Sequence, residues 1–68
     1  MAERREGFEI SWEEPPVIAY KWQTTIASND PRLFSLVSRN LVLLSAPTRE
    51  RALTDARLFV AFVLSLAI

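Results

Sequence analysis

The chain has 68 residues, half of them hydrophobic, and its eight Lys or Arg residues balance eight Asp or Glu residues. This length allows one domain at most, and the apolar content is too high for a disordered chain. The absence of Cys and His excludes disulfides, thiolate metal sites and the commonest general base at neutral pH. Because small domains without disulfides or metals are commonly stabilised by association, a partner or oligomerisation is favoured.

The charges are unevenly distributed along the chain. Residues 1–20 hold two Arg against five Glu, a net charge of −3, whereas residues 21–68 hold six Lys or Arg against three Asp or Glu, a net charge of +3. The split indicates either packing of the acidic segment on the basic one or a basic face for an anionic partner. We favour packing within the chain, because three excess charges are few for a nucleic-acid surface.

The segment 8–28 is predicted to be extended, after a polar tail. Residues 1–7 are hydrophilic and are interpreted as a polar tail. Apolar and polar side chains alternate over 8–12, which is the pattern of a half-buried strand, and two consecutive prolines end it. Residues 17–28 also alternate, yet apolar residues recur there at every fourth position as on a helix. We favour a strand, with a helix as the alternative, so that 8–28 forms an extended or hairpin segment.

A helix is predicted over 31–44. Asp30 can accept a hydrogen bond from an unpaired backbone N–H as the N-cap residue, and Pro31 suits the first helical position because its missing N–H would be unpaired there. An apolar stripe continues to Leu44, and Pro47 then breaks the helix.

A second helix is predicted over 48–66, running into the uncharged end at 58–68. A short break between two amphipathic helices is typical of an antiparallel helical hairpin. The predicted fold is therefore a single α+β domain, mainly helical, in which the extended segment 8–28 packs on a two-helix antiparallel hairpin.

The uncharged end at 58–68 is too short to span a bilayer, which takes about 20 apolar residues. It can belong to the chain's own core, to an interface with another protein or a second copy, or to a segment lying in a membrane surface. The hydrophilic start and the absence of Cys lead us to expect an intracellular, cytoplasmic protein.

Catalytic, cofactor-binding and metal-binding residues are not predicted. The sequence has no Gly-rich phosphate loop and no metal-ligand spacing. Glu13 and Glu14 are adjacent beside two prolines, which is typical of a solvated turn, and the serines lack an evident base. A non-enzymatic function follows.

We therefore expect a small interaction protein or accessory subunit whose C-terminal helix docks in a groove of a protein partner or of a second copy. The predicted anchors are Phe59, Val60, Val63 and Leu64. The first alternative is a nucleic-acid-binding accessory protein that contacts phosphates through its arginines. The residues of that alternative are Arg32, Arg39, Arg49 and Arg51. The second alternative is a peripheral membrane protein with the C-terminal segment in the interface.

Three short motifs carry a resemblance to a group of proteins. The chain reads F-E-I-S-W-E-E-P-P over 8–16, K-W-Q-T-T-I-A over 21–27 and P-R-L-F-S-L-V over 31–37. It thereby resembles small, mostly uncharacterised proteins of actinobacteria and their phages, which open with F-E-x-x-W-E-E-P-P. The resemblance implies a helix over 21–27, an extended stretch within 31–37 and, in some members, DNA binding.

Overall fold

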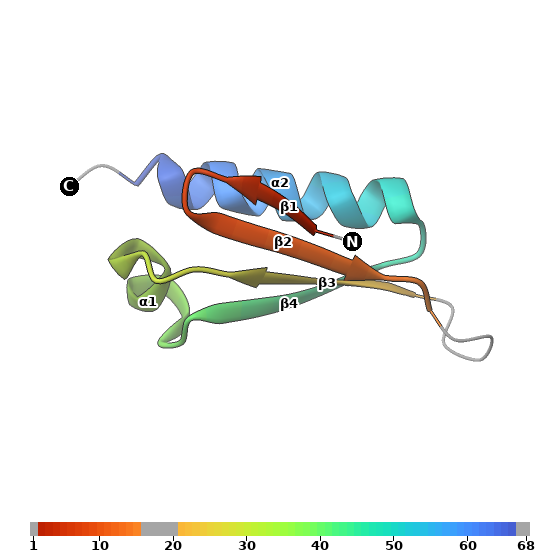
Figure 1. Cartoon of the computed structure of the whole chain (residues 1–68), viewed down its shortest axis with the longest axis horizontal. Helices are drawn as coiled ribbons and strands as arrows, with labels where there is room; N and C mark the ends of the chain where they lie inside the picture. Colours follow the sequence, from red (N-terminus) through yellow and green to blue (C-terminus); the bar gives the residue numbers. More distant parts are fainter. Residues whose placement is uncertain (1, 16–20, 67–68) are drawn as a thin grey trace.

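The computed structural model describes residues 2–15 and 21–66. The central element of the fold is a four-stranded antiparallel sheet in the order β1-β2-β3-β4. The elements are β1 Ala2–Arg5, β2 Phe8–Glu13, β3 Trp22–Ala27, α1 Pro31–Val37, β4 Leu41–Ala46 and α2 Arg49–Leu64. α2 covers one face of the sheet along its length, and α1 lies at the end where the chain passes from β3 to β4 (Figure 1).

The segment predicted to be a polar tail is strand β1. A two-residue turn joins it to β2, with Arg5 directly opposite Phe8. The turn residues Glu6 and Gly7 both have positive φ, 47° and 90°, as a type I′ turn requires. Glu3 of β1 also contacts α2, because its carboxylate lies 2.7 Å from the Arg57 guanidinium. The hairpin and this ion pair hold the charged segment as an edge strand.

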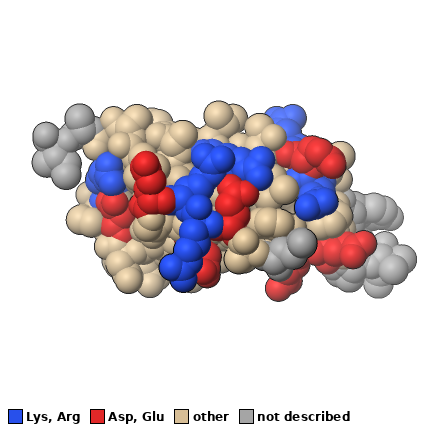
Figure 2. All heavy atoms as spheres, turned by 45° about the horizontal axis from the view of Figure 1, so that its top comes forward, with Lys and Arg blue, Asp and Glu red and all other residues tan. Residues whose placement is uncertain are grey.

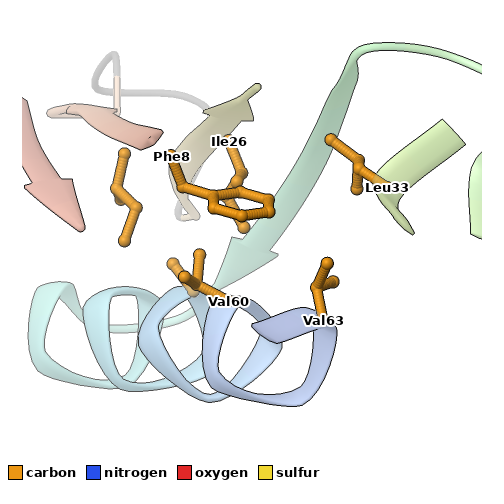
Figure 3. Close-up of a cluster of buried hydrophobic side chains, with 7 residues drawn as sticks. Phe8, Ile26, Leu33, Val60 and Val63 are labelled. Atoms are coloured by element: carbon orange, nitrogen blue, oxygen red, sulfur yellow. The ribbon is translucent and has the colours of Figure 1, made fainter. Parts of the chain in front are cut away.

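The core lies between the sheet and α2. Alternate residues of β2 and β3 point to the helix, as in an antiparallel sheet with one covered face. Figure 3 shows these side chains converging with those of both helices. The buried cluster is Phe8, Ile10, Ile26, Leu33, Ala56, Val60 and Val63. α1 adds its buried Leu33 to this cluster, so both helices share one core with the sheet.

The prediction of a mainly helical fold with a helical hairpin is wrong. The helix predicted over 31–44 ends at Val37, and Ser38 takes a left-handed conformation with φ 56°. Strand β4 follows and separates α1 from α2 along the chain. The apolar run at the start of β4 fits a helix or a strand equally well by periodicity. The strand forms because this segment pairs with β3, which lies well before it in the sequence.

The secondary structure implied by the resemblance is reversed. The stretch implied to be a helix contains β3, and the stretch implied to be extended is α1. Asp30 caps α1 by accepting a hydrogen bond from the Arg32 backbone N–H at 2.8 Å, with Pro31 next to it. The second predicted helix, 48–66, corresponds to α2, whose N-cap is Thr48. Of the ambiguous segment 17–28, residues 17–20 lie outside the described part of the chain.

Candidate functional site

The two edges of the sheet differ in chemistry. β1 forms one edge and carries Glu3, Arg4 and Arg5 among its four residues. β4 forms the other edge, reads L-V-L-L-S-A and carries no charge. No described element lies beyond β4 in the plane of the sheet (Figure 1). Charged side chains on an edge strand discourage pairing with another chain, whereas an uncharged edge is a template for it.

The backbone groups of β4 that face the free edge follow from the ladder with β3. Beyond the last ladder pair, the Ser28 N–H donates to the Asn40 carbonyl at 2.9 Å, so these opposite residues form a hydrogen-bonded pair. Hydrogen-bonded and non-hydrogen-bonded pairs alternate in an antiparallel ladder. Val42, Leu44 and Ala46 therefore direct their backbone N–H and C=O groups to β3. The other residues of β4 direct these groups away from the sheet. The outward-directed residues are Leu41, Leu43 and Ser45.

The side chains of β4 are apolar on both faces of the sheet. Leu43 lies on the face opposite α2 and is 68% exposed, and Leu41 on the same face is also exposed. Val42 and Leu44 point towards the core but remain half-buried. A shallow hollow of about 480 Å³ lies at the start of the strand. It is lined by Val37, Arg39, Leu41, Val42 and Leu43.

α2 extends this apolar edge. Arg57 reaches Glu3 on β1 and therefore marks the side of α2 that faces the β1 edge. Phe62 follows five residues later, about 140° around the helix at about 100° per residue, and so lies on the opposite side, towards β4. It is 53% exposed, and Phe59 beside it is half-buried. We call the combined surface the β4 flank. It comprises Leu41, Val42, Leu43, Leu44, Phe59 and Phe62.

The four predicted anchors do not gather on one surface. Val60 and Val63 are fully buried in the chain's own core, and Phe59 and Leu64 are half-buried. Phe59 alone belongs to the β4 flank. The exposed apolar residue Phe62 was missed, although its position three residues after Phe59 places it on the same side of a helix. A role of the four anchors in partner binding stays a prediction.

Arg32 is engaged within the chain. Its guanidinium lies 2.6 Å from the Asp30 carboxylate, and its Nη1 donates to the Leu64 carbonyl at 2.9 Å. The Arg32 guanidinium, with the Arg32 backbone N–H, lowers the pKa of Asp30 to about 2. Arg32 thus ties the start of α1 to the end of α2 and is occupied with these contacts.

The other three predicted arginines have different neighbours. Arg39 borders the hollow at β4, Arg49 lies over the Trp12 ring at 6.0 Å from its centroid, and Arg51 pairs with Asp55 at 3.2 Å. Figure 2 shows basic and acidic side chains interspersed over the visible face rather than one basic patch.

Metal-binding clusters and membrane-spanning helices are both absent from the described ranges, 2–15 and 21–66. These residues contain no cluster of three His, Cys, Asp or Glu side chains that could hold a metal ion. Among them, no helix combines the length and apolar character needed to cross a membrane. No protein-family model, curated protein or solved structure matches the chain.

Proposed function

We propose that the chain is a small non-enzymatic interaction protein or accessory subunit that binds another protein chain by strand addition at the β4 flank. The observation that carries this proposal is the uncharged free edge of β4, where three residues direct their backbone groups outwards. In strand addition, main-chain hydrogen bonds supply affinity and alternate side chains supply specificity.

The β4 flank provides both contributions. Each main-chain hydrogen bond adds about 0.5–1.5 kcal/mol net, and the outward residues of β4 offer several. Covering Leu43 and Phe62, which are more than half exposed, removes apolar area from water on both sides of the added strand. The nucleic-acid alternative receives less support, because Arg32 is bound to Asp30 and Arg51 pairs with Asp55.

Site-specific photocrosslinking tests the proposal. A photoreactive amino acid at position 43 should give an adduct with a second polypeptide in cells of the source organism. The matched control is position 9, because Glu9 is also exposed on the face of the sheet opposite α2 but lies on the interior strand β2. We expect adducts at 43 and not at 9, and we expect Leu41→Lys to reduce those at 43. Equal yields at both positions would refute binding at the β4 flank.

A further inference from the structure

We propose that the chain bound at the β4 flank is a second copy of this protein, paired β4 to β4 in antiparallel orientation about a two-fold axis at Leu43. The two four-stranded sheets then form one continuous sheet. This inference rests on the proposed function, since it names the partner of the same surface. A two-fold interface requires a surface that is complementary to itself, and the β4 flank has this property in two respects.

The first respect is the backbone register. In an antiparallel pair about Leu43, Leu43 faces its own copy and Leu41 faces Ser45 of the second copy, so every outward-directed residue of the strand meets another. A shift in one direction places Leu41 opposite Pro47, which has no N–H to donate. A shift in the other direction places Ser45 opposite Arg39, which lies outside the strand. The Leu43-centred register therefore makes the most hydrogen bonds.

The second respect is side-chain complementarity. The same register sets Leu43 against Leu43 on the face opposite α2 and sets Val42 against Leu44 on the α2 side. Directly opposite side chains in a sheet interact, and like charges there are destabilising. Because β4 is uncharged, self-pairing brings no like charges together within the strand. The exposed Phe62 lies on the β4 side of α2 and adds an apolar side chain on that side of the helix.

The size of the interface requires more than the strand alone. A stable interface commonly covers about 800 Å² of each partner, which compares with a total surface of 4919 Å² for this chain. A six-residue strand is only about 20 Å long at about 3.4 Å per residue, so the strand needs the adjoining side chains of α2. Because interfaces of standard size have dissociation constants from about micromolar to picomolar, a dimer of this kind should be populated well above micromolar concentrations of the chain.

Cysteine crosslinking tests the register, because the natural chain has no Cys. Opposite residues of a hydrogen-bonded pair have Cα atoms about 5.5 Å apart, within the range of about 4.4–6.8 Å that a disulfide allows. Leu43→Cys should therefore form a covalent dimer under mild oxidation or with a short thiol-reactive linker. Mixed Leu41→Cys and Ser45→Cys chains should crosslink to each other. Gln23→Cys, exposed on the same face but in β3, is the control and should stay monomeric.

Light scattering during size-exclusion chromatography measures the mass. At about 100 μM, well above a micromolar dissociation constant, the natural chain should give twice its 7.8 kDa. Leu43→Lys should give a folded monomer, and Gln23→Lys should remain a dimer. A dimer that crosslinks at 43 supports the inference.

A monomeric natural chain that still gives photoadducts with a different protein at position 43 overturns self-pairing but leaves the proposed function standing. The absence of any adduct at 43 overturns both. A dimer that persists in Leu43→Lys and fails to crosslink at 43 places the self-interface elsewhere and also refutes the inference.

Discussion

Thr24 offers a sharp test of the packing between the sheet and α2. Its side chain is fully buried on β3, and its hydroxyl has no hydrogen-bond partner among the described residues. Thr24→Val keeps the shape and replaces the hydroxyl by a methyl group. An unpaired buried hydroxyl costs about 1–3 kcal/mol, so the free energy of unfolding should rise by about that amount. In a domain of this size, the melting temperature should increase by about 4–8 °C per kcal/mol.

Urea denaturation followed by tryptophan fluorescence measures this change. Thr25→Val is the matched control, because Thr25 is the next residue of β3, points to the opposite face and is only half-buried. Both substitutions are made in a Leu43→Lys chain so that self-association adds nothing to the measured stability. The gain from Thr24→Val should exceed that from Thr25→Val by at least about 1 kcal/mol. A loss of stability on Thr24→Val would show that the hydroxyl is hydrogen-bonded in the folded protein.

Three further predictions concern the core, the ion pair and the turn. Val63→Asp should unfold the chain, because an unpaired buried charge costs at least about 3 kcal/mol. The control Leu58→Asp, on the exposed side of α2, should change the free energy of unfolding by about 0.5 kcal/mol at most. Similar thermal melts of the two variants, followed by circular dichroism, would contradict the burial of Val63. Arg57 lowers the pKa of Glu3 from 4.5 to about 2. The stabilisation of the fold by the Glu3–Arg57 ion pair is therefore complete above about pH 4.5 and is lost as the pH falls towards 2. Glu3→Gln should lower the free energy of unfolding at pH 7 and should make it fall less steeply between pH 4.5 and 2. An unchanged dependence of stability on pH in this range would refute the role of the ion pair. Glu6→Asn should stabilise the chain by up to about 1 kcal/mol, because the left-handed conformation costs most residues about 1–2 kcal/mol and Asn adopts it more readily. A lower melting temperature would argue against the type I′ turn.

Local chemistry made some elements predictable. The start of α1 follows from Asp30 and Pro31, whose preferences need no distant contact. The alternation at Phe8 and Ile10 corresponds to β2, where both side chains point to the core. In each case the residues that define the element are adjacent in sequence, so their pattern carries the information.

The strands at the two edges were missed for different physical reasons. β1 has no apolar periodicity that a sequence pattern could reveal. Its position depends instead on the turn at Gly7 and on the ion pair between Glu3 and Arg57. β4 begins with Leu41 and three further apolar residues, a run that has no period of its own. In both cases a contact distant in sequence selects the structure.

The β4 flank could not be read from the sequence, because an edge is a property of the whole sheet. The predicted anchors came from the apolar end of the chain, yet α2 turns its Ala52, Ala56, Val60 and Val63 stripe towards the sheet. The small alanines let the helix lie close to the strands, which buries the two valines. The same rotation leaves Phe62 exposed on the β4 side of α2.

The contrast between the two edges limits the assembly that the β4 flank can form. If both edges were uncharged, pairing could continue from one copy to the next and build an open filament. Here β1 carries a carboxylate and two guanidinium groups, and Glu3 among them is held by Arg57 of α2. β4 is thus the one uncharged edge of the described sheet, and pairing it with its own copy consumes the available edge of both chains. A closed dimer, whose mass does not grow with concentration, is the assembly that this asymmetry favours.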